Sequence, residues 1–287
     1  MLTTQEVLQG ERRRRPPPSL KQQYQEYVLE RIEAYKNSMP RSELLRLGDE
    51  AFSELQATAE GQFVLTEVLM LDSVDRLIMK RLALKPYRRW RTHFKKVRDA
   101  QRQPTRWGLD AASPLAALLP RLEPEDVTLV VGAGAEPAVY LLAAHDVLVT
   151  FLAADLGAVE RCESRIAAEA LGGLFEAYVV QLGGWLPAGP MVDVMVLDAG
   201  AFAEVPGALQ AEFLRDAQSR TRVGGVHVIL PGGDGFAPEA LLSHYDDDGW
   251  EPDRVGKSRR SDRRAAGIAL TRKCCDESEE GGEAVGR

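Results

Sequence analysis

The sequence is poor in the features that define several protein classes. Its three cysteines, Cys162, Cys274 and Cys275, include no C-x-x-C pair, so we expect neither a disulfide framework nor a cysteine-based metal site. No apolar run approaches the ~18 residues that a membrane-spanning helix needs, and no internal repeat is present. These absences argue against a disulfide-rich secreted domain and a membrane protein. They favour a cytoplasmic protein without a membrane partner or a metal site.

The overall composition is that of an ordinary globular protein. Hydrophobic residues make up 45% and charged residues 28% of 287 residues, and the formal net charge is -7. That charge gives the chain as a whole no attraction for nucleic acid. The ends are atypical: we expect residues 1–18, which are basic and end in three prolines, to form a flexible arm. Residues 274–287 are acidic and glycine-rich, and we expect a disordered tail.

Residues 19–107 show helical periodicity and predict an all-α N-terminal domain of four helices. The first begins at Leu20 and ends near Pro40. In the second, the pattern places Leu44, Leu45, Ala51, Phe52 and Leu55 inward. The third covers about 62–84, and the fourth lies between Pro86 and Pro104.

Residues 108–273 alternate between short apolar runs and helical stretches, which predicts an α/β domain. Strands are expected at 127–131, 147–153, 175–182, 192–197 and 226–230, with helices at 136–144, 156–171, 209–219 and 239–245. Because the strands are apolar on both faces, the sheet should be parallel and covered on both sides. Two further extended stretches, 250–255 and 266–271, have no helix between them. We therefore expect a Rossmann-like, mostly parallel sheet that finishes with an antiparallel strand.

The first strand-turn-helix unit carries the strongest indication of a ligand. Gly132-Ala133-Gly134 follows a buried strand and precedes a helix, where glycine permits a tight turn and close approach of a ligand to the main chain. Asp155 follows the second strand, where a carboxylate can accept hydrogen bonds from ribose hydroxyls. Asp155 is also suited to cap the next helix. This arrangement favours a ligand that contains adenosine.

The region from about Asp110 to Lys273 resembles the Rossmann-like (class I) S-adenosylmethionine-dependent methyltransferase superfamily, without identifying a subfamily. The resemblance rests on residues 129–134, Asp155, residues 192–198 and 223–226, and the final antiparallel pair. It implies that Gly132 and Gly134 face the methionine part of the cofactor and Asp155 the ribose. It also implies that Asp198 lies at the floor of the site. The implied cofactor-binding set is Gly132, Ala133, Gly134, Asp155, Leu156, Gly184, Trp185 and Asp198.

The chain also departs from the superfamily pattern. Val130 stands where the first strand usually carries an acid, Glu136 stands at the third glycine, and Gly183-Gly184 replace an acid beside the adenine. These departures keep open a non-catalytic relative that serves as a binding or scaffold protein. A nicotinamide-dependent oxidoreductase is disfavoured, because Pro137 replaces the glycine that packs close to a pyrophosphate. The sequence names neither the methyl acceptor nor a general base.

The predicted fourth helix carries a row of basic residues along its length, although the protein has a negative net charge. Arg88, Arg91, Lys95, Arg98 and Arg102 recur at spacings of three and four. They lie one position after an apolar stripe of Tyr87, Trp90, Phe94 and Val97, which should dock on the other helices. One interpretation is a solvated face whose side chains pair with neighbouring acids. The other assigns Arg88, Arg91, Lys95 and Arg98 to a phosphate-bearing acceptor such as RNA.

Overall fold

The computed structural model describes residues 19–58, 67–183, 186–232, 238–252 and 267–273. The expected arm at 1–18 and the expected tail at 274–287 lie outside these residues. The chain divides between Val97 and Arg98 into two compact units, and each is described by itself below. No helix among the described residues is both long enough and apolar enough to cross a membrane.

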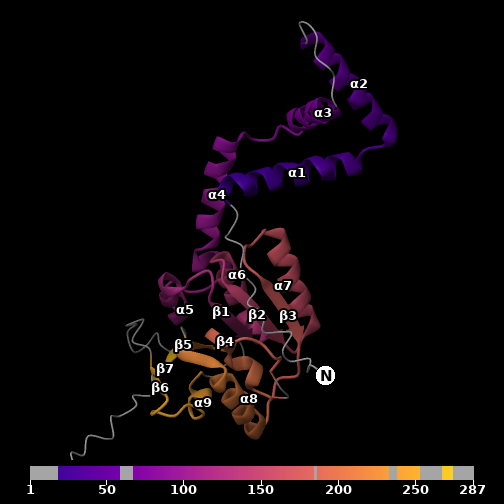
Figure 1. The fold of residues 1–287 in the computed structure, drawn as a ribbon. Helices are drawn as coiled ribbons and strands as arrows, with labels where there is room; N and C mark the ends of the chain where they lie inside the picture. The colour runs from indigo at the N-terminus through magenta and orange to yellow at the C-terminus, as the bar shows by residue number, and fades with distance from the viewer. Residues whose placement is uncertain (1–18, 59–66, 184–185, 233–237, 253–266, 274–287) are drawn as a thin grey trace, which may run out of the picture. The chain divides into compact units, whose positions relative to one another are not determined.

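The first unit is helical (Figure 1). Its helices are α1 (Leu20–Ser38), α2 (Arg41–Thr58), α3 (Glu67–Arg81) and α4 (Tyr87–Gln101), the last of which continues past the division of the chain. Helix α1 begins with a capping box: the Ser19 hydroxyl accepts the Gln22 amide, and the Gln22 side chain accepts the Ser19 amide. Such reciprocal capping satisfies two amides that the first turn leaves without partners.

The core of the helical unit is small and differs from the expected one. Its buried residues are Ile32, Leu47, Ala51, Leu77 and Ile78. The expectation that Leu44, Leu45 and Phe52 point inward is wrong, since these residues are 37%, 63% and 40% exposed. Helix α2 packs mainly on α3, and only the narrow stripe that contains Leu47 and Ala51 reaches the core.

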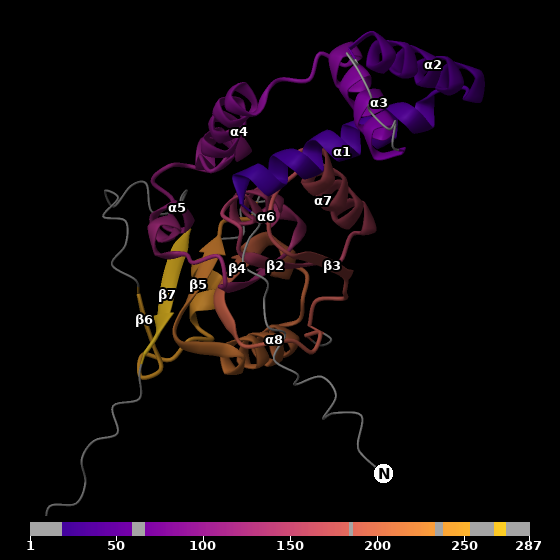
Figure 2. The ribbon, with the colours of Figure 1, turned by 45° about the horizontal axis from the view of Figure 1, so that its top comes forward.

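The second unit is an α/β unit with a seven-stranded sheet in the order β3-β2-β1-β4-β5-β7-β6 (Figure 2). Strands β1 to β5 are parallel, and β7 is antiparallel to both β5 and β6. The predicted fold class is therefore confirmed. The strands are β1 (Val127–Val131), β2 (Leu148–Ala153), β3 (Phe175–Val179), β4 (Val192–Asp198), β5 (Thr221–Leu230), β6 (Trp250–Pro252) and β7 (Ile268–Arg272).

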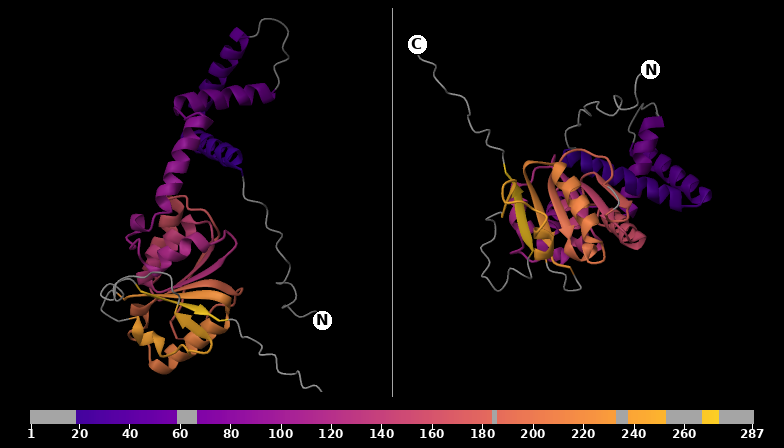
Figure 3. Two further views of the ribbon diagram at one scale, coloured as in Figure 1. Left: turned by 90° about the vertical axis from the view of Figure 1, so that its left-hand side faces the viewer. Right: turned by 90° about the horizontal axis from the view of Figure 1, so that it is seen from below.

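Helices cover the two faces of this sheet, as the left panel of Figure 3 shows. One face packs against α5 (Pro114–Leu118), α6 (Glu136–Ala144) and α7 (Leu156–Ala168), with Val130, Phe151 and Val196 in the core. The other packs against α8 (Gly207–Ser219) and α9 (Glu239–Leu242), with Met195 and Leu197 in the core. Burial on both faces explains why β1 and β4 are almost wholly apolar.

One corner of the second face carries no helix among the described residues. The connection from β3 to β4 contains no helical segment in its described part. Thr150, Glu176 and Tyr178 lie beside a hollow of about 80 Å³ there, together with Arg220. A parallel sheet that a helix covers would present aliphatic side chains at these positions. The polar side chains therefore agree with the absence of a covering helix among the described residues.

The segment that follows Val97 packs on the α/β unit. Arg98 and Arg102 both form ion pairs with Asp146, and Arg106 pairs with Glu169 at 2.7 Å. The Trp107 indole donates a hydrogen bond of 2.6 Å to the Gln101 carbonyl. The end of α4 is thereby tied to the loops that follow α6 and α7.

A buried histidine joins β5 to the segment after α9. The Thr221 hydroxyl donates to the Ala217 carbonyl and lies 2.7 Å from His227 Nε2, while His227 Nδ1 lies 2.7 Å from the Tyr245 hydroxyl. Because the Thr221 proton is used on Ala217, Nε2 must donate and Nδ1 must accept from Tyr245. Burial lowers the pKa of His227 to about 3. The imidazole is thus a neutral structural group, with both ring nitrogens bonded.

We predict that His227 makes the protein less stable in acid. In the unfolded chain the imidazole takes up a proton below its ordinary pKa of 6.5, whereas the folded protein keeps it neutral down to about pH 3. The unfolded state then binds more protons than the folded state. The free energy of unfolding therefore decreases as the pH is lowered from 6.5 to about 3, by up to about 1.4 kcal/mol per pH unit. Urea unfolding between pH 7 and pH 4 measures this slope. His227→Gln should flatten it, and His93→Gln, at an exposed position, should not; equal slopes for both variants would contradict the assignment.

Candidate functional site

The turn after β1 lies at the edge of the sheet where the parallel strands end. Gly132 has a φ of +100°, a conformation that favours glycine. Its amide donates to the Leu152 carbonyl of β2 at 2.8 Å, and its carbonyl accepts the Ala135 amide at 3.1 Å. Helix α6 starts at Glu136. Ala133 is partly exposed and Gly134 is exposed, so a ligand can reach the main chain there.

Asp198, the last residue of β4, closes this turn from the neighbouring strand. Its Oδ2 accepts the Gly134 amide at 2.8 Å and its Oδ1 accepts the Gly200 amide at 3.0 Å. A Cβ at Gly134 would lie 2.5 Å from Oδ2, and one at Gly132 would lie 2.6 Å from the Asp198 Cβ. Contact with Asp198 therefore requires glycine at both positions. The side chain that the resemblance assigns to the floor of the site is buried and braces the turn.

Asp155 lies just beyond β2, which ends at Ala153. Its two carboxylate oxygens accept the Gly157 and Ala158 amides at 3.0 and 3.1 Å, so Asp155 is the N-cap of α7. The side chain nevertheless remains 61% exposed. Each carboxylate oxygen can accept a second hydrogen bond, which leaves room for a polar ligand beside the cap. Leu156, the next residue, is 57% exposed.

These residues meet at one place in the topology. Strand β1 has β2 on one side and β4 on the other. The connection after β1 therefore leads to one side of it, and the connection after β3 crosses to the other side. Open α/β sheets bind ligands at such a switch point, outside the carboxyl ends of the strands. In this chain the Gly132–Gly134 turn and Asp155 follow strands at that edge, and Asp198 is the last residue of a strand there. Residues 184 and 185, assigned by the resemblance to the adenine, lie outside the described residues.

The strand order separates two kinds of nucleotide-binding sheet. A dinucleotide-binding sheet has the order 3-2-1-4-5-6, whereas here the reversed strand β7 is inserted between β5 and β6. This mostly parallel sheet with a late antiparallel strand is the one that the resemblance implied. The α/β unit therefore has a Rossmann-like fold with a late antiparallel strand.

The solved structures that are similar to the chain include several methyltransferases. An rRNA methylase from Streptococcus thermophilus matches with a TM-score of 0.40 at 13% identity, over 56% of this chain and 94% of that one. A Streptococcus mutans structure named as a methyltransferase, with SAH bound, gives 0.41 at 12% identity, over 55% and 94%. A glycopeptide N-methyltransferase with S-adenosylhomocysteine gives 0.35 at 14% identity, over 42% and 52%. No family model and no curated protein matches the chain.

Two residues of the α/β unit outside the predicted cofactor-binding set, Glu136 and Arg161, form an ion pair beside Asp155. Arg161 of α7 lies 2.6 Å from Glu136 and 3.8 Å from Asp155. Glu136 occupies the position of the superfamily's third glycine, so this acid holds a cation beside the proposed ribose contact. No sequence signal marked this contact, because Arg161 follows Asp155 by six residues and not by the three or four that bring helical side chains together.

The described part of the chain offers this site neither a cluster of metal ligands nor an activated thiol. The described residues contain no cluster of three or more His, Cys, Asp or Glu side chains that could hold a metal ion. Cys162 is buried on α7, and burial raises the pKa of its thiol to about 11. A thiol that stays protonated at neutral pH is a poor nucleophile.

We predict that the two roles of Asp155 can be separated by substitution. Serine caps helices about as well as aspartate but is too short to bridge two ribose hydroxyls. Asp155→Ser should therefore keep the melting temperature while weakening S-adenosylhomocysteine binding by about 1.5–3 kcal/mol, the range for hydrogen bonds to a charged group. Asp155→Ala should lose the same affinity and about 1 kcal/mol of stability as well. Calorimetric titration and thermal unfolding measure the two effects. If Asp155→Ser binds as tightly as the native chain, the carboxylate serves only as a cap.

Proposed function

We propose that the α/β unit binds S-adenosylmethionine at the switch-point edge of its sheet and transfers the methyl group to an acceptor. The observation that carries this proposal is the position of the Gly132–Gly134 turn. It lies at the carboxyl end of β1, beside the turns that follow β2 and β4, in a sheet with the methyltransferase strand order. The strand order places the switch point beside β1, and open α/β sheets bind their ligands at that edge.

The residues at this edge fit a nucleoside with a short polar tail. Asp155 offers an exposed carboxylate with acceptor positions still open. The exposed Leu156 beside it supplies an apolar surface for a base. Ala133 and Gly134 expose main chain to the tail. We therefore assign Asp155 to the ribose, Leu156 to the base and the Gly132–Gly134 turn to the methionine part. Gly184 and Trp185 remain proposed adenine contacts.

The chemistry demands little of the protein beyond placement. Bound S-adenosylmethionine supplies a methyl group on a positively charged sulfur. The chain's own residues hold the ribose, exclude water and align the acceptor, and such positioning can provide most of the rate. Methyltransferases that act on planar amino groups carry an Asn-Pro-Pro-Tyr-like motif at the end of the fourth strand. This chain has Asp198-Ala199-Gly200-Ala201 there. A planar amino group is therefore disfavoured as the methyl acceptor.

A second candidate is a methyltransferase-fold protein that binds partners without catalysis. Asp198 favours this second candidate, because each of its two carboxylate oxygens already accepts a hydrogen bond from a main-chain amide. The glycines of the turn are thus required by the protein's own packing, whether or not a cofactor binds. Val130 and Glu136 at positions that usually carry an acid and a glycine support the same candidate.

Calorimetric titration of the full chain with S-adenosylmethionine, S-adenosylhomocysteine and NAD tests the proposal. We expect the first two to bind and NAD not to bind. Gly134→Ala should abolish binding, because the new Cβ would lie 2.5 Å from Asp198 Oδ2 and the turn would have to move. Gly207→Ala is the matched control, since nothing lies within 4 Å of the added Cβ there.

The outcomes separate the candidates. Binding of both adenosyl ligands that is lost in Gly134→Ala alone supports the cofactor site. Failure of all three ligands to bind would leave the non-catalytic candidate, and preferential binding of NAD would overturn both.

A further inference from the structure

Helix α4 is anchored in the helical unit by its aromatic side. Trp90 is 7% exposed, and its ring lies 5.3 Å from that of Tyr24 and 4.7 Å from that of Phe94. The Tyr24 hydroxyl also donates to the Lys85 carbonyl at 3.1 Å, just before α4 begins. The predicted apolar stripe therefore packs against α1 through Trp90, and this contact fixes which side of α4 faces outward.

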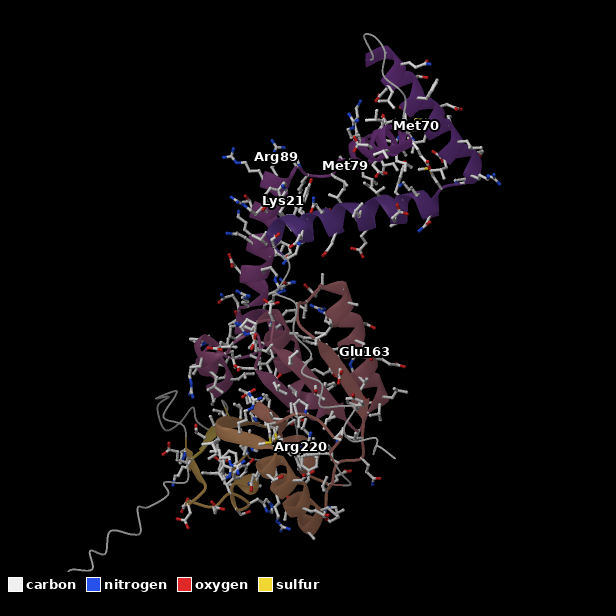
Figure 4. All side chains as sticks on the ribbon, viewed as in Figure 1. Lys21, Met70, Met79, Arg89, Glu163 and Arg220 are labelled. Carbon is white, nitrogen blue, oxygen red and sulfur yellow. The ribbon has the colours of Figure 1, made fainter. Side chains whose placement is uncertain are left out.

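The outward side carries five exposed cations: Arg88, Arg89, Arg91, Lys95 and Lys96, which we call the cationic face. In Figure 4, nitrogen-tipped side chains project from α4 around the labelled Arg89. None of these five forms an ion pair with any residue that the structure describes. Arg91 instead lies over the Tyr87 ring, 6.0 Å from its centre.

The basic row found in the sequence thus divides into two parts with different roles. Arg98 is 18% exposed and pairs with Asp146, as does Arg102. These two guanidinium groups are explained by packing within the α/β unit, so Arg98 is left out of the binding surface. The pairing interpretation holds for this part and fails for the cationic face.

Helix stability does not explain the cationic face. Arg88 and Arg89 lie in the first turn of α4, which contains no acidic residue, and the helix dipole disfavours cations there. Like charges at spacings of three and four also repel one another. The side chains that keep α4 in place are aromatic, so these cations are costly to the fold and call for an external partner.

We propose that the cationic face binds the phosphate backbone of single-stranded RNA. Arg88, Arg91 and Lys95 form one row of about 10 Å, from a rise of 1.5 Å per residue, which suits a single strand that lies along the helix. Three of the five cations are arginines, whose planar groups stack on unpaired bases as well as pairing with phosphates.

The helix is poorly suited to an anionic membrane. Helices that bind membranes present an apolar side beside their cations, whereas Trp90, the largest apolar residue of α4, is buried. The inference names a partner class for the proposed methyl transfer and rests on that function only for the role of the bound RNA. Binding itself needs no cofactor.

Fluorescence anisotropy with an oligouridylate of about 20 nucleotides tests the proposal on the full chain across a range of salt concentrations. A variant with Arg88, Arg91 and Lys95 changed to Gln removes three phosphate contacts. Since each contact contributes about 0.7 to the slope of log K against log salt for single strands, the slope should fall by about 2. Affinity at about 50 mM salt should drop more than about tenfold.

Two further variants act as controls. In the first, three exposed arginines of α1 and α2 are changed together to Gln: Arg31, Arg41 and Arg46. This variant loses the same charge as the cationic-face variant, and its slope of log K against log salt should equal the native slope within error. Every variant retains Arg12–Arg15. A second variant with Arg88 and Arg91 changed to Lys keeps the charge and should retain the native slope. Thermal unfolding confirms that each variant folds.

The remaining outcomes overturn the inference. They are no RNA binding at low salt, an equal loss in both triple variants, or equal affinity for duplex DNA or phosphatidylserine vesicles. Titration of the cationic-face triple variant with S-adenosylhomocysteine keeps the two proposals apart. A native chain that binds RNA but no adenosyl ligand would contradict the proposed function alone, and one that binds the ligand but no RNA would contradict this inference alone.

Discussion

The contact of Asp198 with the turn after β1 is the interaction on which the candidate site depends. One carboxylate accepts amides from Gly134 and Gly200, and so joins the ends of β1 and β4 at the switch point. The closeness of that contact leaves no space for a Cβ at Gly132 or Gly134. The shape of the ligand edge is thus determined inside the protein, before any ligand arrives. A preformed edge of this kind lowers the entropic cost of binding.

The same contact changes the meaning of the G-x-G motif. Taken alone, two glycines before a helix indicate close approach of a ligand, but here an aspartate from β4 already makes the close approach. Asp155 shows a similar overlap, because a side chain that caps α7 is also positioned to accept ribose hydroxyls. Ligand binding at this edge must therefore add to structural roles that the acids already perform. That is why placement in the topology, rather than the motif, carries the functional proposal.

The fold could be predicted from the sequence because its signals are local. Apolar runs of five to seven residues predicted β1 and β4 nearly to the residue. Two extended sequence stretches without a helical pattern between them predicted the antiparallel end of the sheet. Strand β5 begins at Thr221, earlier than expected, because it continues through an irregular pairing near Gly224, whose φ is +77°. Contacts between residues that are distant in the sequence could not be predicted from local patterns. Nothing local in the sequence distinguishes Arg98, which pairs with Asp146, from Arg91, which forms no ion pair with the described residues.

Amide chemical-shift mapping with S-adenosylhomocysteine tests the central claim most directly, because it locates the ligand as well as detecting it. The account predicts perturbations at the turn after β1 and the start of α7, led by Ala133, Gly134, Leu156 and Gly157, with the hollow beside Thr150 and Tyr178 unchanged. The opposite pattern, with shifts at that hollow and an unaffected Gly132–Gly134 turn, would contradict the assignment of the ligand to the switch-point edge.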